Sequence, residues 1–173
     1  MKFVECTAER HSAAILEIFN EAIANSTAIY EYELLKPDYM VKWFDTKARG
    51  NYPVIGLETD AGELAGFASF GKFRDRPAYK YTIEHSVYVE TRFRGQKLGS
   101  RLLEAVMEAA VKQNYHVMMG GIDAANAVSI RLHERFGFTY CGTVAQAGFK
   151  FGRWLDLAFY QRVLSGPLAP VEG

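Results

Sequence analysis

Residues 87–100 decide the fold, and they read Val87-Tyr88-Val89-Glu90-Thr91-Arg92-Phe93-Arg94-Gly95-Gln96-Lys97-Leu98-Gly99-Ser100. A β-rich run ends here, a basic loop follows, and apolar residues then recur at helical period as far as Gln113. The first turn of a helix exposes backbone N–H groups, and the helix dipole adds partial positive charge there. A phosphate or pyrophosphate binds well at such a place. The segment therefore predicts an anion site at a strand–loop–helix junction.

The side chains of this loop support the prediction but leave a second interpretation open. Gly95 and Gly99 allow a ligand to approach the backbone closely, and Arg92, Arg94 and Lys97 add positive charge. Taken alone, Gly99 could simply permit helix packing, and the basic residues could form a solvated face. The loop matches neither G-x-x-x-x-G-K-[ST] nor G-x-G-x-x-G, so the sequence does not indicate an NTPase or a nicotinamide enzyme.

The rest of the chain predicts alternating elements around this junction. Helices are expected over residues 12–25, 39–49 (after Pro37-Asp38), 98–113 and 126–136. Strands are expected over residues 3–6, 52–59, 64–73, 79–89, 116–122, 138–144 and 154–163, with a tight turn at residues 60–62. We therefore expect an α+β fold, in which helices flank a mostly antiparallel sheet with one internal βαβ crossover.

Composition narrows the class of protein. The 173 residues are 49% hydrophobic and 14% aromatic, which excludes a disordered chain and predicts one domain over residues 1–173 with a loose tail from about residue 165. Twenty basic and twenty acidic residues give a net charge of zero, so neither nucleic acid nor a membrane is an expected partner. Cys6 and Cys141 lie outside any CxxC spacing, and no signal segment is recognisable. The expectation is a cytoplasmic protein without a metal site.

The junction resembles the pyrophosphate loop of the GNAT superfamily of acyl-CoA-dependent N-acetyltransferases, which reads Q/R-x-x-G-x-G/A. Arg94 takes the first position and Gly99 the last, but Lys97 stands where the first glycine is expected. Lys97 can present its amide like the family's glycine only if it adopts an ordinary backbone conformation. The resemblance implies a GNAT-like sheet with a βαβ acetyl-CoA-binding core and acetyl-CoA as cosubstrate.

A closer resemblance covers nearly the whole chain and rests on several separated motifs in the same order. These are Asn25-Ser26-Thr27-Ala28, Tyr52-Pro53-Val54, Thr82-Ile83-Glu84-His85-Ser86-Val87-Tyr88-Val89, Ser129-Ile130-Arg131-Leu132-His133-Glu134 and Gly148-Phe149-Lys150-Phe151-Gly152-Arg153-Trp154-Leu155-Asp156. They are similar to the bacterial phosphinothricin and methionine sulfone/sulfoximine acetyltransferases. The resemblance implies a homodimer and a role in detoxification.

By the same resemblance, the cofactor-binding residues are Val87, Tyr88, Val89, Gly95, Gln96, Lys97, Leu98, Gly99, Ser100 and Asn126. The first three would bind the pantetheine arm through backbone groups, and residues 95–100 would wrap the pyrophosphate. Two plainer interpretations stay open: residues 87–89 could be ordinary strand residues, and Asn126 could serve only as a helix N-cap.

Two residues are candidates for proton transfer. An ammonium substrate must lose a proton before it can attack a thioester, and Glu84 lies beside the expected acetyl site on the same strand. The alternative is an outward-facing, solvated carboxylate. His133 stands where many GNAT enzymes have a tyrosine that protonates the leaving thiolate, and an imidazole can do the same at neutral pH. The alternative is a histidine that only packs.

The substrate is expected to be held by Arg74, Asp75, Arg76, Glu84, His85 and Ser86. Guanidinium groups suit the carboxylate and the sulfoximine or phosphinate oxygens, although residues 74–76 also read as a plain charged turn. The predicted reaction is acetylation of the α-amine of small amino-acid analogues, namely methionine sulfoximine, methionine sulfone or phosphinothricin, by direct transfer in a ternary complex. Two alternatives remain: a protein or peptide N-acetyltransferase, and a non-catalytic acyl-CoA-binding module.

Overall fold

The computed structural model describes residues 1–172, which form two compact units. Unit one consists of Met1–Phe70 and Ser86–Val106, and unit two consists of Gly71–His85 with the residues from Met107 onward. Two strands and one helix contribute residues to both units, and each unit is described by itself below.

Unit one begins with a strand and two helices. Strand β1 spans Lys2–Glu5, helix α1 spans Ala8–Asn25, and helix α2 spans Pro37–Arg49. The side chain of Thr7 caps α1 by accepting a hydrogen bond from the backbone N–H of Arg10. Pro37 opens α2 at a position where its missing N–H costs nothing. Helix α1 buries one apolar stripe, made of Ile15, Ile18, Phe19, Ala22 and Ile23.

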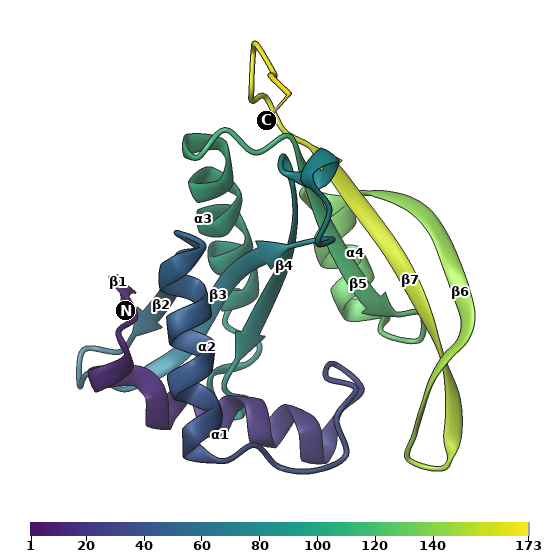
Figure 1. Ribbon diagram of the computed structural model, residues 1–173. Coiled ribbons are helices and arrows are strands. Elements are labelled where there is room, and N and C mark those ends of the chain that lie inside the picture. The colour runs from purple at the N-terminus through teal and green to yellow at the C-terminus, as the bar shows by residue number, and fades with distance from the viewer. Residues whose placement is uncertain (173) are drawn as a thin grey trace. The chain divides into compact units, whose positions relative to one another are not determined.

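Antiparallel strands pack against helix α1 and form the other side of that apolar core. Strand β2 (Val54–Glu58) pairs with both β1 and β3 (Leu64–Lys72). Phe19 of α1 contacts Trp43, Phe67 and Tyr88 edge to face, with ring centroids 5.3–5.6 Å apart. The two helices lie next to each other in Figure 1. These contacts fix β3 and the end of β4 (Thr82–Val89), on which candidate cofactor residues lie.

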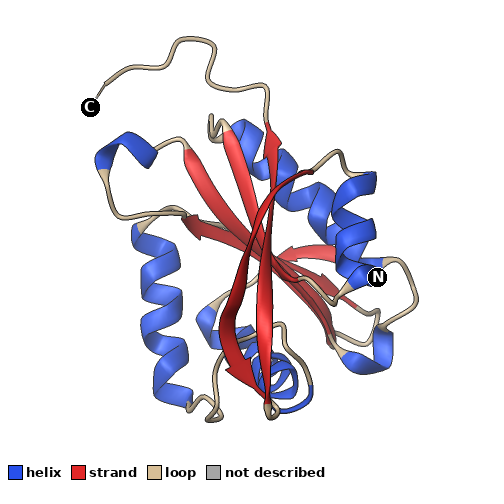
Figure 2. Ribbon diagram, turned by 90° about the vertical axis from the view of Figure 1, so that its right-hand side faces the viewer, coloured by secondary structure: helices blue, strands red, loops and turns tan. Residues whose placement is uncertain are grey.

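Unit two is built on a parallel pair and a long hairpin. Strand β4 pairs in parallel with β5 (Val117–Asp123), where Thr82, Ile83 and Glu84 face Val117, Met118 and Met119. Strand β5 pairs antiparallel with β7 (Arg153–Val163), which pairs with β6 (Thr139–Lys150). Figures 1 and 2 show β6 and β7 running alongside each other as the longest strands of the unit. Helix α4 (Ala127–Arg135) follows β5, Phe136 is its C-cap, and Gly137 with a φ of 73° turns the chain away from the helix.

The strand order is β1-β2-β3-β4-β5-β7-β6, and helix α3 (Leu98–Lys112) connects the parallel strands β4 and β5. This mixed, mostly antiparallel sheet with one βαβ crossover confirms the predicted α+β fold. The largest error in the bounds concerns the strand expected over 138–144, which extends to Lys150. An irregularity between Val144 and Gly148, with Gln146 at a φ of 53°, hides its continuation from the alternation pattern.

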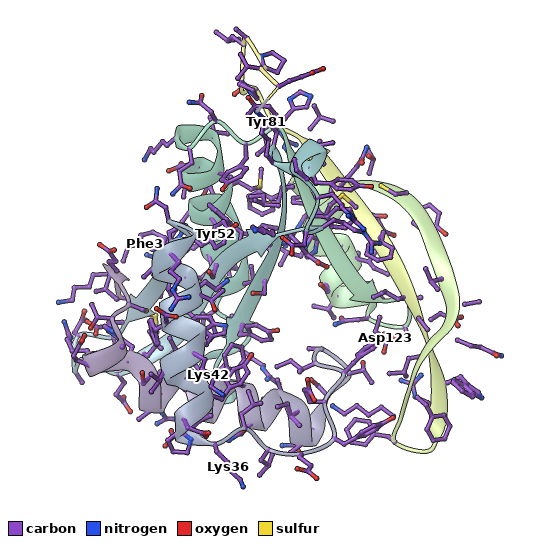
Figure 3. The ribbon with its side chains drawn as sticks, in the orientation of Figure 1. Phe3, Lys36, Lys42, Tyr52, Tyr81 and Asp123 are labelled. Carbon is purple, nitrogen blue, oxygen red and sulfur yellow. The ribbon has the colours of Figure 1, made fainter. Side chains whose placement is uncertain are left out.

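The predicted strand over 79–89 also begins later than expected. Pro77–Tyr79 forms a 3₁₀ turn, because proline fixes φ and supplies no N–H for a ladder, and β4 starts at Thr82. The segment expected to form a loose tail makes contacts within unit two. Gly166 is buried, and the Val171 N–H donates to the hydroxyl of Tyr81, a residue labelled in Figure 3, at 3.1 Å.

Candidate active site

Glu84 occupies a partly buried position at the end of the β4–β5 ladder in unit two. Burial raises the pKa of its carboxyl group, and the positive charge of Arg74 lowers it by a smaller amount. A Cβ atom at Gly121 of β5 would lie 3.1 Å from Oε1 of Glu84. The missing side chain of Gly121 therefore leaves room for the carboxylate. A carboxylate with a raised pKa is a stronger base than an ordinary glutamate.

Arg74, Asp75 and Arg76 do not act as one group. The charge of Arg74 acts on Glu84, and its guanidinium lies over the ring of Phe73 at 5.1 Å from the centroid. Asp75 instead pairs with Lys72 at 3.1 Å, on an exposed turn. Arg76 precedes the 3₁₀ turn at Pro77 and is also exposed. The structure thus brings one of the three predicted substrate residues to the candidate base.

His85 and His133 meet inside unit two. Their Nε2 atoms are 2.9 Å apart, and Nδ1 of His85 lies 2.7 Å from the carbonyl oxygen of Met119. Nδ1 of His133 lies 2.7 Å from the carbonyl oxygen of Ser129. Both rings also contact Phe138, at 5.3 and 5.1 Å between centroids. All four ring nitrogens therefore have partners inside the protein, and neither histidine keeps one for a substrate.

Burial controls the proton affinity of the two histidines. It lowers the pKa of His133, and together with repulsion from His133 it lowers the pKa of His85 to about 3. Gly120 supplies the space for both rings, since a Cβ atom there would lie 3.0 Å from Cε1 of His85 and 3.4 Å from Nε2 of His133. Consecutive glycines at 120 and 121 thus accommodate the histidine pair and Glu84.

The candidate cofactor loop belongs to unit one. Val87, Tyr88 and Val89 end β4, and the Glu90 N–H that follows donates to the Ala65 carbonyl oxygen at 2.9 Å. A Cβ atom at Gly66 would lie 2.6 Å from the Tyr88 carbonyl oxygen, so the two strands approach closely there. The three residues are ordinary strand residues by geometry, and nothing in their contacts conflicts with backbone binding of an acyl chain.

Lys97 does not adopt the ordinary backbone conformation on which its glycine-like role was expected to depend, and it takes the conformation of a glycine instead. Its φ is 62°, in the left-handed region that favours glycine, and Gly95 in the same loop has a φ of 79°. The backbone keeps the shape that a glycine would give, and Lys97 bears the steric cost of about 1 kcal/mol. The Lys97 carbonyl accepts from the N–H groups of Ser100 and Arg101, at 3.1 and 3.3 Å, and opens α3.

Two basic residues of the loop have acidic partners. Arg92 pairs with Glu63 and Glu90, both at 3.2 Å, and Arg94 pairs with Glu21 at 2.8 Å. Nε of Arg94 also donates to the Val89 carbonyl oxygen at 3.2 Å. Their charge is therefore balanced locally, and they hold the loop against the end of β4. The N-terminus of α3, with the exposed residues 95–97 before it, remains the part of the loop that fits an anion.

The remaining predicted cofactor residues divide between the units. Leu98 is buried, while Gly99 and Ser100 lie in the half-exposed first turn of α3. Ser86 lies on β4 in unit one. Asn126 belongs to unit two and caps α4, because its side-chain oxygen accepts from the Ser129 N–H at 3.1 Å. The predicted N-cap role is therefore present in the structure.

The loop between β5 and α4 contains an acidic residue that the sequence did not single out. Asp123, labelled in Figure 3, is 7% exposed and lies at the end of β5. Its Oδ1 accepts from the Ala125 N–H at 2.9 Å, and its Oδ2 lies 3.6 Å from Arg153. These contacts shape the turn that leads into Asn126.

Sequence reasoning also missed Gly120 and Gly121. A pair of glycines inside an apolar strand is a recognisable signal, since glycine weakens a strand and marks close approach of another group. Which group approaches follows only from the fold. Among residues 1–172, no set of three or more His, Cys, Asp or Glu side chains is arranged to hold a metal ion. Over the same range, every helix is too short or too polar to cross a membrane.

The family follows from comparison with known proteins. Residues 14–138 match the acetyltransferase (GNAT) family. Because this match covers more than half of the chain, the protein belongs to the GNAT family of acetyltransferases. The predicted resemblance is confirmed.

Individual similar proteins indicate which kind of acetyltransferase this chain resembles. The chain is 46% identical over 147 residues to an L-methionine sulfoximine/L-methionine sulfone acetyltransferase of Pseudomonas aeruginosa, covering 85% of this chain and 86% of that one. A solved structure from Acinetobacter baylyi ADP1, assigned to the acetyltransferases, has 52% identity and a TM-score of 0.98 over 99% of this chain and 96% of that one. A phosphinothricin acetyltransferase of Sinorhizobium meliloti in complex with acetyl-CoA has 33% identity and a TM-score of 0.94, covering 99% and 94%.

Proposed function

We propose that this protein is an acetyl-CoA-dependent N-acetyltransferase that acetylates the α-amine of small amino-acid analogues by direct transfer in a ternary complex. Methionine sulfoximine and methionine sulfone are the proposed substrates, with phosphinothricin as a poorer one. The observation that carries the proposal is the half-buried Glu84 carboxylate, with its raised pKa and the charge of Arg74 close by, in a chain of the acetyltransferase family.

Glu84 is the proposed general base. At neutral pH the α-amine arrives as an ammonium ion, and Glu84 takes its proton directly or through water. Arg74 then has two effects: it favours the ionised form of Glu84, and its guanidinium is suited to a substrate carboxylate. Arg76 and Ser86 remain proposed substrate contacts. His85 and His133 both have their nitrogens occupied, which favours water over His133 as the proton donor to the leaving thiolate.

The cofactor-binding roles stay proposals for residues 87–89, 95–100 and Asn126. Backbone groups near Val89 would polarise the thioester carbonyl, and the N-terminus of α3 would hold the pyrophosphate. The left-handed conformation at Gly95 and Lys97 supports this role, because it directs the loop backbone in the way a glycine-rich loop does.

The oligomeric state and the physiological role of the protein are two further parts of the proposal. The β6–β7 hairpin exposes Tyr140, Phe149, Phe151 and Trp154, each at least 45% accessible. Large exposed aromatic side chains gathered on one hairpin are typical of a contact surface, which supports a homodimer. The proposed substrates are toxic analogues of amino acids, so acetylation in the cytoplasm would detoxify them.

Release of free thiol from acetyl-CoA tests the activity directly. The panel contains methionine sulfoximine, methionine sulfone, phosphinothricin, ordinary amino acids and a lysine-containing peptide. We expect saturable turnover with the sulfoximine and sulfone, and weaker turnover with phosphinothricin. Turnover on the peptide alone would establish a protein acetyltransferase, and acetyl-CoA binding without turnover on any amine would favour a binding module.

The variant Glu84→Gln tests the catalytic role. We expect kcat to fall by about 10²–10⁴-fold, since a positioned general base contributes that much, while the KM for acetyl-CoA stays unchanged. Glu134→Gln, at an exposed position on α4, is the matched control and should retain full activity. A fully active Glu84→Gln enzyme would remove Glu84 from the role of base.

A further inference from the structure

The partners of His85 and His133 determine where their protons lie. Carbonyl oxygens only accept hydrogen bonds, so Nδ1 of His85 donates to Met119 and Nδ1 of His133 donates to Ser129, each at 2.7 Å. A neutral imidazole carries one N–H group. If both rings are neutral, both Nε2 atoms are therefore bare and carry a lone pair.

The distance between the two Nε2 atoms does not fit a neutral pair. At 2.9 Å it is the length of a hydrogen bond, and two lone pairs facing each other at that distance repel. Three hydrogen bonds require three protons, whereas two neutral rings supply two. Ser129 Oγ could in principle donate to Nδ1 of His133, but it lies at 3.4 Å, and the closer carbonyl would then face a lone pair.

We infer that His85 and His133 share one extra proton between their Nε2 atoms at acid pH, and that the pair holds in place the strand that carries Glu84. The kinetic part of this inference rests on the proposed function; the shared proton does not. Because all four ring nitrogens are engaged internally, the two histidines are positioning residues. They hold in place the strand that carries the Glu84 carboxylate.

The histidine pair lies directly after Glu84 along β4. The parallel ladder between β4 and β5 extends as far as Glu84 and Met119. His85 is the next residue, and its ring is hydrogen-bonded to the Met119 carbonyl oxygen at that end of the ladder. His133 ties the same ring to α4. The pair therefore fixes the strand immediately after the candidate base.

Burial disfavours any charge on the pair beyond the one shared proton. The ionisable groups on the surrounding elements are Glu84 on β4, Asp123 on β5, Glu134 on α4, and Tyr160 and Arg162 on β7. The influences on the pKa of His85 are burial, His133 and the Met119 carbonyl. Burial lowers the pKa of both rings, so the pair takes up its one proton below the ordinary histidine value of 6.5.

Glu84 and His85 are consecutive residues of β4, so their side chains lie on opposite faces of the sheet, Glu84 next to Gly121 and His85 next to Gly120. The pair therefore acts on Glu84 through the position of the strand that they share.

Nitrogen-15 NMR of the wild-type protein tests the shared proton without reference to activity. With labelled histidines, followed from pH 5 to 8.5, we expect both Nδ1 atoms to be protonated throughout. At low pH both Nε2 resonances should move together in one coupled step that takes up a single proton. Two Nε2 atoms that stay unprotonated at every pH at which the protein is folded would overturn the inference, as would a bare Nδ1 on either ring.

Variants test the positioning of Glu84. His133→Gln and His85→Gln remove the shared proton and its hydrogen bond, and we expect kcat to fall by about tenfold with the KM for acetyl-CoA little changed. The control is His116→Gln, because His116 also has a carbonyl partner, Gly166 at 2.8 Å, but lies outside the pair. A rise of the KM for acetyl-CoA as large as the fall of kcat would show a general loss of structure and overturn the positioning role. Absence of turnover in the wild-type enzyme would contradict the proposed function and leave the NMR result to decide the shared proton.

Discussion

His11 in unit one and His85 in unit two are buried to a similar degree, at 3% and 8% exposed, but their rings have opposite kinds of partner. Nδ1 of His11 accepts from the Thr7 N–H at 2.9 Å, and Nε2 donates to Glu58 at 3.1 Å. A neutral ring satisfies both contacts with its one proton. His85 has a carbonyl and a second histidine as partners, and its contacts require an extra proton.

The difference teaches that burial alone does not decide the charge of a histidine. Glu58 carries the negative charge of the first cluster, and Arg10 balances it from 2.7 Å away. Hydrogen bonding from His11, followed by the charge of Arg10, lowers the pKa of Glu58 despite opposition from burial. In the second cluster the partners are two carbonyl oxygens and two imidazoles, so a charge is present only when the pair takes up its extra proton at low pH, and that charge is positive.

The largest effect should come from removing the counter-charge in unit one. Glu58→Gln leaves Arg10 and His11 without the carboxylate that both contact, and we expect a loss of about 3 kcal/mol in the free energy of unfolding at pH 7. Because the folded-state pKa of Glu58 is lowered, its contribution is present above the unfolded value of 4.5 and is lost as the pH falls through the folded value. Urea denaturation from pH 7 to 3 should therefore show the gap between wild type and variant closing toward low pH. A pH-independent gap would contradict this account.

A smaller effect is expected from crowding the pair in unit two. Gly120→Ala places a Cβ atom 3.0 Å from His85 and 3.4 Å from His133, so the rings must move apart. We expect about 2 kcal/mol of destabilisation, typical of overpacking, and loss of the coupled histidine step in the NMR titration. Gly121→Ala is the neighbouring control: it should preserve the histidine step and instead disturb Glu84, whose Oε1 lies 3.1 Å from the added atom. A histidine step that survives in Gly120→Ala would show that the two rings do not need their close contact to share a proton.

The comparison also shows where sequence reasoning succeeds. The junction at residues 87–100, the hairpin turn and the helical stripe of α1 depend on local periodicity and turn chemistry, which a single sequence contains. The βαβ crossover and the mixed sheet were therefore predictable. Glu84 and His133 could be named as candidates from their places in motifs.

The remaining features depend on contacts between residues far apart in the sequence. Nothing in the segments around His85 and His133 indicates that two rings 48 residues apart meet at 2.9 Å. The left-handed conformation of Lys97 was not predictable either, because a lysine ordinarily avoids it and only the surrounding loop imposes it. The same holds for Arg92 and Arg94, each of which has an acidic partner from a distant part of the sequence, Glu63 and Glu21. Motifs name the chemical groups, and tertiary contacts set their protonation and availability.

The smallest effect concerns Lys47, a half-buried lysine whose contacts among residues 1–172 are a carbonyl oxygen and two aromatic rings. Nζ of Lys47 in α2 donates to the Phe70 carbonyl oxygen at 2.8 Å and lies over the rings of Trp43 and Tyr52, and burial lowers its pKa to about 8. Between that value and the unfolded value of 10.5, the unfolded chain binds more protons, so stability should rise with pH. Because the side chain is only partly buried, we expect a gain of about 1 kcal/mol between pH 8 and 10.5 relative to Lys47→Met. Lys42→Met, at an exposed position of the same helix, is the control and should keep the wild-type slope of stability against pH; Lys42 is labelled in Figure 3.

Parallel stability curves for wild type and Lys47→Met would mean that a carbonyl oxygen and two aromatic rings stabilise the ammonium group as well as water does. In that case a buried cation in this protein would need no acidic partner, and the contrast between the two histidine clusters would lose its electrostatic basis.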